Sequence, residues 1–241
     1  MRLVTTKKIN TNEEGQFRAL VDSISEADRA TLNALLVALR TRDVDTYCHS
    51  RRTVSISVLL GRECGLDPEQ MRSLELGALL HDIGKIGIPD VVLRKPAKLN
   101  ELEWEMMRRH PQMGEEILSG LSFLNHARKI VGQHHEKWDG SGYPLGLRGE
   151  EIELAARILL VADAFDAMVS DRVYRYARSY EAAVAELDYC AGTQFDPRVV
   201  AAFHRLPRFV WERIDGRKNL MAFGVQRGDC TTERLAPRKV N

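Results

Sequence analysis

The sequence lacks any long hydrophobic run and any excess of charge of one sign. Its 241 residues contain 35 Lys and Arg against 34 Asp and Glu, so no overall field favours a nucleic acid polymer or an anionic membrane surface as a partner. The chain has no run of about 18 apolar residues, and its first residues lack the apolar centre of a secretory signal. We therefore expect a cytoplasmic protein without membrane association.

Cysteine is scarce and scattered. The four cysteines, Cys48, Cys64, Cys190 and Cys230, are far apart and form no C-x-x-C pair. This spacing favours a reducing compartment, with thiols packed as small apolar groups, over a disulfide framework.

Segments with the alternating pattern of β-strands are also missing, and the apolar residues recur instead at helical spacing. Asp67, Pro68 and Gln70 predict a capping box, and Asn100 with Glu103 gives a second cap signal. Helices are expected from about residue 26, over 44–64, from 68 to about 81, from 100 through 110, over 126–135 and 154–168, and after the cap at Asp196 and Pro197. Residues 138–151 read as a glycine-rich loop. The fold class is all-α.

Seven histidines are present, and five of them lie at or near apolar helical stripes. These are His49, His81, His110, His134 and His135, and the acids Asp82 and Asp163 join them. To bury so many polar groups without a cation would leave donors unpaired and like charges together. Imidazoles and carboxylates without a thiolate suit iron, manganese or zinc. His126 and His204 are expected to be surface or hydrogen-bonding residues.

Three motifs carry a resemblance to a known family. They are "HDIGK" at residues 81–85, "HHEKWDGSGYP" at 134–144 and "VADAFDAMVSDRVYR" at 161–175. In this order and spacing they resemble the HD-GYP family, the branch of the HD phosphohydrolases that degrades cyclic di-GMP. The match runs from about residue 42 to 203, with Ala97 where the family usually has glycine. It implies an HD-domain-like helical bundle over 41–205 with a GYP loop, between a helical lead-in (1–40) and a C-terminal extension (206–241).

The resemblance also implies a set of metal ligands. His49, His81, Asp82, His110, His134, His135 and Asp163 would hold two or three divalent ions, most simply iron or manganese, with Asp82 as the bridging carboxylate. Asp45 stands where the family commonly has tyrosine and some three-metal members have an acid. It lies one turn before His49 on the same helix face, so we expect a third-metal ligand, and a helix N-cap is the alternative.

Basic and aromatic residues complete the implied site. Lys85 would act in catalysis and bind a phosphate oxygen, although a lysine at a helix C-terminus is also stabilised by the helix dipole. Arg172 and Arg175 resemble a phosphate-gripping pair, and the alternative for Arg175 is a surface ion pair with Asp171. Tyr143 would pack on a substrate base or on a partner protein.

The function implied is a metal-dependent phosphodiesterase that opens cyclic di-GMP to pGpG, GMP or both. Two alternatives stay open. One is a module that binds cyclic di-GMP or a diguanylate cyclase without turnover, and the other is a hydrolase of another dinucleotide such as cyclic GMP-AMP. Further implied partners are GGDEF-domain proteins, through the GYP loop, and a second copy of the chain.

Overall fold

The expected all-helical architecture is confirmed. The computed structural model describes residues 24–170 and 176–215, and within these ranges it contains helices and short 3-10 turns but no β-strand. The first half comprises α2 (Glu26–Arg42), α3 (Val44–Glu63), α4 (Pro68–Leu80), η1 (Ile83–Gly87), α5 (Asp90–Leu93), α6 (Glu101–Met107) and α7 (His110–Ile117). The second half comprises η2 (Ser122–Leu124), α8 (Asn125–Gln133), η3 (Gly149–Glu151), α9 (Leu154–Val169), α10 (Tyr180–Tyr189), α11 (Pro197–Arg205) and α12 (Arg208–Asp215).

The helix starts follow the cap signals of the sequence. Asp67 and Asn100 both form complete capping boxes, with Gln70 and Glu103 respectively. The prediction of one helix from residue 100 through His110 is wrong, because α6 ends at Met107 and α7 begins at His110. Pro111 has no backbone N–H to donate to the carbonyl oxygen of Met107, and proline is favoured in the first turn of a helix, so α6 ends and α7 begins here.

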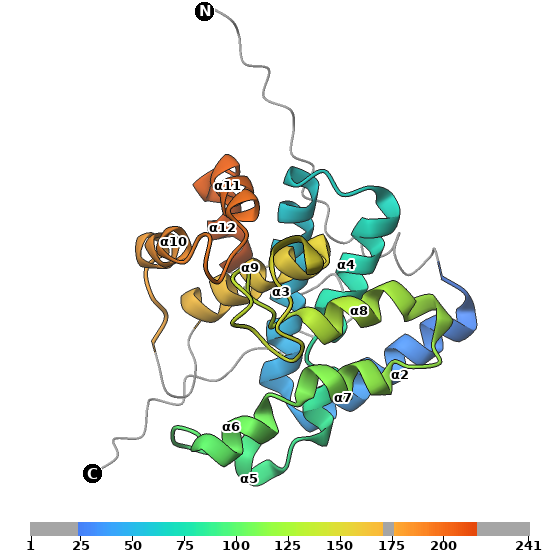
Figure 1. The fold of residues 1–241 in the computed structure, drawn as a ribbon. Helices are drawn as coiled ribbons and strands as arrows, with labels where there is room; N and C mark the ends of the chain where they lie inside the picture. The colour runs from blue at the N-terminus through green and yellow to red at the C-terminus, as the bar shows by residue number, and fades with distance from the viewer. Residues whose placement is uncertain (1–23, 171–175, 216–241) are drawn as a thin grey trace, which may run out of the picture.

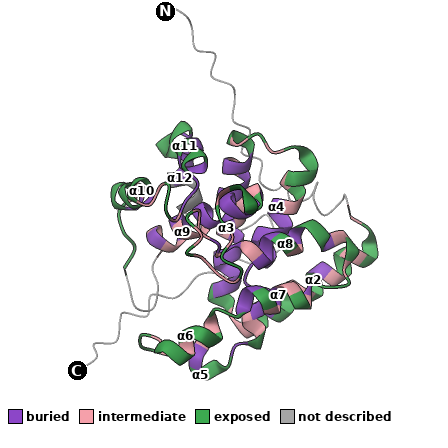
Figure 2. Ribbon diagram, in the orientation of Figure 1, coloured by how far each residue is buried: buried purple, intermediate pink, exposed green. Residues whose placement is uncertain are grey.

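The core is built around α3, which lies in the middle of the molecule and contacts α2, α4, α9, α11 and α12 (Figure 1). The larger hydrophobic cluster joins α3, α4 and α9 to α10, α11 and α12, and includes the stacked rings of Phe203 and Trp211. The smaller cluster joins α2, α4 and α8. Figure 2 shows these buried faces turned inward and the outer faces of α2, α6 and α10 exposed.

The flanking helices belong to this core. Leu32 and Leu39 of α2 are buried, as is Trp211 of α12. The division of the chain near residues 40 and 205 remains a prediction. None of the described helices is long and apolar enough to span a membrane.

One expectation about the cysteines is wrong. Cys64 and Cys190 are free thiols, as expected. Cys48, however, takes part in a disulfide bond, whose partner is not among the described residues.

Candidate metal centre

Helix ends bring the imidazoles together. His81 is the C-cap of α4, His134 is the C-cap of α8, and His110 is the first residue of α7. His49 lies in the second turn of α3, and Asp163 lies within α9. The close approach of η1 to α7 depends on Gly84, where a Cβ atom would lie 1.9 Å from the carbonyl oxygen of His110. No other residue fits, so this glycine sets the distance between the "HD" segment and His110.

The side chains form two groups that could each hold a cation. One group is His49, His81 and Asp163, and the other is His110, His134 and His135. Within each group the ligand atoms lie within 4.8 Å of one another. These two groups contain six of the eight metal ligands expected from the sequence.

Asp82 lies between the two groups. Its Oδ2 is 3.4 Å from Nε2 of His81, and its Oδ1 is 3.3 Å from Nε2 of His110. One carboxylate therefore faces both groups, each with a different oxygen. This placement matches that of a bridging ligand.

The tautomers of three histidines follow from their backbone partners. Nδ1 of His81, His110 and His134 donates to the carbonyl oxygen three residues earlier, at 2.7, 2.8 and 2.7 Å. A carbonyl oxygen only accepts, so each Nδ1 carries the proton and each neutral Nε2 presents a lone pair. Yet Nε2 of His110 lies 3.1 Å from Nε2 of His134. Two facing lone pairs repel, and a cation beside both would remove the repulsion.

Burial keeps His110, His134 and His135 neutral. It lowers the pKa of His110 to about 4 and that of His135 to about 3, and it lowers the pKa of His134 well below its usual value. For Asp82 burial acts in the opposite sense, but Lys85, His81 and His110 outweigh it and hold its pKa well below the usual range. Neutral imidazoles beside ionised carboxylates are the state in which these side chains bind metal ions. His110, His134 and His135, with Asp82 beside them, therefore fit a divalent cation.

His49 is held by carboxylates on both ring nitrogens. Nδ1 is 2.6 Å from Oδ2 of Asp166, and Nε2 is 2.7 Å from Oδ1 of Asp163. Burial alone would lower the pKa of His49, but these two hydrogen bonds raise it to about 9. Asp166 is in turn held by Arg52, whose Nε and Nη2 donate to its two oxygens at 2.7 and 2.9 Å. Asp166 thus orients His49.

Arg52 is the residue that sequence reasoning missed. It follows His49 by three positions on α3, as Asp166 follows Asp163 by three positions on α9. Residues three apart share a helix face, so this parallel spacing was the available signal.

Lys85 lies beside the bridging carboxylate. Its Nζ donates to Oδ2 of Asp82 at 2.7 Å, and its side chain remains partly exposed. It belongs to η1 and not to the end of α4. The ammonium group is thus next to the centre and open to a ligand.

The glycine-rich loop is fixed by Glu136. This buried carboxylate accepts from the backbone N–H groups of Leu145 and Leu147 at 2.6 and 3.0 Å. At Gly142 a Cβ atom would lie 2.3 Å from the backbone nitrogen of Lys137, so the loop closes tightly on itself. The ring of Tyr143 consequently lies on the imidazole of His135, with centroids 4.8 Å apart and planes at 30°.

One predicted ligand among the described residues, Asp45, lies outside this cluster. Asp45 is exposed in the first turn of α3, and it belongs to neither ligand group. The alternative reading of Asp45 as the N-cap is wrong, because Asp43 caps α3 and accepts from the N–H groups of Asp45 and Thr46. Arg172 and Arg175 lie outside the described residues.

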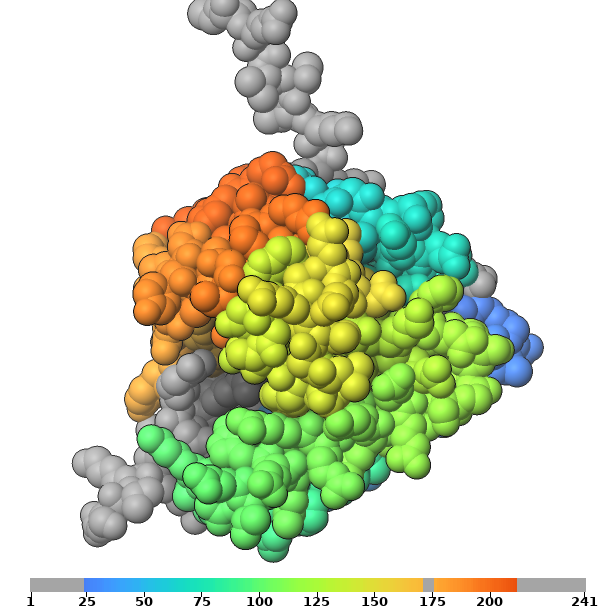
Figure 3. Space-filling model, viewed as in Figure 1, coloured from blue at the N-terminus to red at the C-terminus, as the bar shows by residue number. Residues whose placement is uncertain are grey.

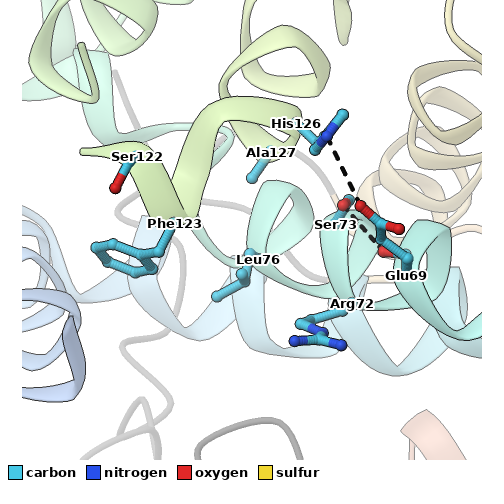
Figure 4. Close-up of a pocket in the computed structure, with 8 residues that line it drawn as sticks. All are labelled: Glu69, Arg72, Ser73, Leu76, Ser122, Phe123, His126 and Ala127. Carbon is cyan, nitrogen blue, oxygen red and sulfur yellow. Dashed lines mark hydrogen bonds and ion pairs between the residues drawn. The ribbon is translucent and has the colours of Figure 1, made fainter. Parts of the chain in front are cut away.

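A surface pocket of about 280 Å³ lies elsewhere, between the N-terminal halves of α4 and α8 (Figure 4). Its polar lining includes Glu69, Arg72 and His126, and His126 is 3.8 Å from Glu69 with both side chains exposed. The histidine cluster is at the opposite, C-terminal ends of the same helices. At ~1.5 Å per residue, the length of α4 separates the two, so this pocket is not part of the centre.

Several known proteins are similar to this chain. Residues 34–199 match the family described as "HD domain". The chain is 45% identical to the cyclic di-GMP phosphodiesterase response regulator RpfG of Xanthomonas campestris, over 80% of this chain and 51% of that protein. It is 41% identical to a cyclic di-GMP phosphodiesterase of Thermotoga maritima, over 69% of this chain and 46% of that protein.

Other relatives act on a different dinucleotide. The chain is 40% identical to the 3'3'-cGAMP-specific phosphodiesterase 3 of Vibrio cholerae, over 66% of this chain and 35% of that protein. Overall, the chain spans about half the length, or less, of the curated relatives it matches.

Among solved structures, an HDGYP protein of Bdellovibrio bacteriovorus superposes with a TM-score of 0.58 at 22% identity, over 80% of this chain and 60% of that one. At this identity the likeness establishes the helical fold alone.

Proposed function

The chain belongs to the HD domain family, and on that premise we propose that it is a metal-dependent phosphodiesterase that hydrolyses cyclic di-GMP. The similarity to proteins named cyclic di-GMP phosphodiesterases bears out the HD-GYP resemblance of the sequence. The observation that carries the proposal is the pair of ligand groups with Asp82 between them and Lys85 beside it.

The proposed ligands divide between two ions. His49, His81 and Asp163 would hold one, His110, His134 and His135 the other, and Asp82 would bridge them. Divalent ions supply Lewis-acid stabilisation of the charge that develops on phosphoryl oxygens. Imidazole and carboxylate donors without thiolate suit iron or manganese.

The chain's own residues then bind and orient the substrate. The Lys85 ammonium donates hydrogen bonds from a position next to Asp82, where a phosphoryl oxygen can replace part of that contact. Burial, with Asp82 and Asp163 nearby, raises the pKa of Tyr143, so its phenol remains a hydrogen-bond donor at neutral pH. Lys85 and Tyr143 can therefore donate hydrogen bonds to the substrate, whereas the ionised carboxylates can only accept them.

Arg172 and Arg175 are proposed to grip a phosphate group. They follow the C-terminal end of α9, the helix that provides Asp163. Arg172→Ala, and more weakly Arg175→Ala, should raise the Michaelis constant by the equivalent of about 1.5–3 kcal/mol with metal content unchanged. Unaltered Michaelis constants in both variants would favour the surface ion-pair reading.

Asp45 is proposed as a ligand of a third ion. It precedes His49 by one helical turn and is exposed, so it would reach an ion only at the outer edge of the centre. Metal analysis of anaerobically purified protein should give close to three ions per chain, and close to two in Asp45→Ala. Two ions in both proteins would contradict this role.

Cyclic GMP-AMP is the second candidate substrate, because some relatives are named 3'3'-cGAMP-specific phosphodiesterases. A non-catalytic binding role is less well supported, since the full set of HD-pair and histidine ligands is present. Metal-loaded protein should be incubated with each dinucleotide and the products separated. Release of pGpG or GMP from cyclic di-GMP supports the proposal, binding without product supports the non-catalytic role, and turnover of cyclic GMP-AMP alone supports the second candidate.

Partners are proposals as well. Leu145, at the tip of the loop that holds Tyr143, is 67% exposed and is the residue a GGDEF-domain protein would contact first. A homodimer would use the exposed side of α2, where Val37 is 52% exposed. Leu145→Asp and Val37→Asp should weaken the respective association in pull-down and sedimentation experiments.

A further inference from the structure

A succession of planar groups leads outward from the metal centre along α6. The Tyr143 ring lies on the imidazole of His135. The guanidinium carbon of Arg108 is 5.7 Å from the centroid of the Tyr143 ring and 6.0 Å from that of Trp104. Trp104 is 46% exposed, so part of its ring faces solvent at the outer end of this succession. Figure 3 shows the α6 surface next to the surface of the glycine-rich loop.

Arg108 is not committed to a carboxylate. No ion pair joins it to an acid of the described residues, whereas Lys95, nearby in sequence, pairs with Glu103 of α6 at 2.5 Å. Arg52, Arg157 and Arg178 each have a carboxylate within 3.1 Å. The Arg108 side chain therefore keeps its donors available while two aromatic rings hold its plane.

The available groups fit a guanine base. A guanidinium fork donates two parallel hydrogen bonds to O6 and N7 of guanine. Adenine presents an amino group in place of O6, and a donor-only guanidinium cannot pair with it. The exposed face of Trp104 offers a stacking surface for either base. Selection between the bases would thus come from Arg108, and general affinity from Trp104.

From this geometry we propose that Arg108 and Trp104 bind a guanine base of the substrate and set the preference for guanine over adenine. The inference rests on the proposed function, because the phosphodiester must lie at Lys85 and the metal ligands for a base to reach α6. Arg108 is a specificity residue here and takes no part in the chemical step.

The test measures base binding apart from turnover. Metal-loaded protein is titrated with GMP and with AMP while tryptophan fluorescence is recorded. Trp211 is buried and Trp138 lies between two arginines, so a quench absent from Trp104→Phe belongs to Trp104. The wild type should bind GMP about tenfold more tightly than AMP.

Arg108→Ala should reduce GMP affinity to that for AMP. Arg109→Ala is the matched control, because it removes the same charge from an adjacent exposed residue without a cation–π contact among the described side chains. It should keep the preference. A preference that survives Arg108→Ala, or that Arg109→Ala removes equally, would overturn the inference.

Turnover of cyclic di-GMP by the wild type is scored separately. Hydrolysis without a GMP preference overturns only this inference. A GMP preference without hydrolysis of any cyclic dinucleotide overturns only the proposed function.

Discussion

At the scale of single residues, Asp82 is the side chain that faces both ligand groups. Its two oxygens face His81 and His110, and Lys85 compensates its charge. Asp82→Asn keeps the shape and removes the charge. Metal content per chain should fall, and turnover should drop by more than the roughly 10–100-fold that follows loss of an outer partner.

Circular dichroism serves as the control for Asp82→Asn, since the apolar face of α4 is untouched. Full metal content with near wild-type turnover would show that Asp82 does not bridge.

Asp166 gives a second residue-scale prediction. Asp166→Asn weakens the support of His49, so metal affinity should fall about 10–100-fold while the helical content is kept. Asp188→Asn is the matched control, because Asp188 also lies 2.6 Å from a histidine, His204, but on the exposed surface. Equal metal affinity in both variants would contradict an orienting role.

At the scale of elements, the start and the buried face of α4 follow from the sequence, but its buried Glu75 carboxyl group does not. Its capping box and its buried residues Leu74, Ala78 and His81 follow from the sequence pattern. Glu75 lies on the same helix, is only 9% exposed, and makes no hydrogen bond through its carboxylate among the described residues. Burial raises its pKa to about 7, although Arg62 and Arg72 act against the shift.

Glu75→Gln should therefore stabilise the protein in a pH-dependent way. Because burial raises the pKa of Glu75 in the folded state, protonated Glu75 stabilises the wild-type protein fully below the unfolded pKa of about 4.5. This contribution is lost as the pH rises through about 7, because the buried carboxyl group must then ionise. A glutamine stays neutral and avoids that loss. Urea unfolding should show the variant about 2–3 kcal/mol more stable at pH 8 and little changed near pH 5. The exposed Glu116→Gln is the control, and a pH-independent difference would contradict the assignment.

What the sequence could predict was set by local signals. Helix periodicity and caps are local, so α3, α4 and α8 and the burial of their histidines were predictable. The break at Pro111 and the disulfide of Cys48 were missed. The Arg52–Asp166 pair joins residues of α3 and α9 that meet only in the folded chain, so the three-residue spacing on each helix could not by itself identify the two as partners.

At the scale of the whole molecule, the ligands come from five helices or the residues that directly follow them, namely α3, α4, α7, α8 and α9. The apolar clusters hold these helices in place, although the lone pairs on Nε2 of His110 and Nε2 of His134 repel each other. The scaffold thus stabilises an arrangement that is unfavourable by itself, as functional sites commonly are.

The two groups differ in how far apart their members are along the chain, and this difference has a kinetic consequence. His110 begins α7, and His134 and His135 directly follow α8, whereas the other group needs α3, the end of α4 and Asp163 of α9. Short-range contacts form before long-range ones because closing a longer loop costs more entropy. Refolding in the presence of metal should therefore take up ions in two phases, the first at residues 110–135 and the second when α9 docks. A metal-sensitive dye in a stopped-flow experiment would resolve them, and Asp163→Ala should abolish the slow phase alone.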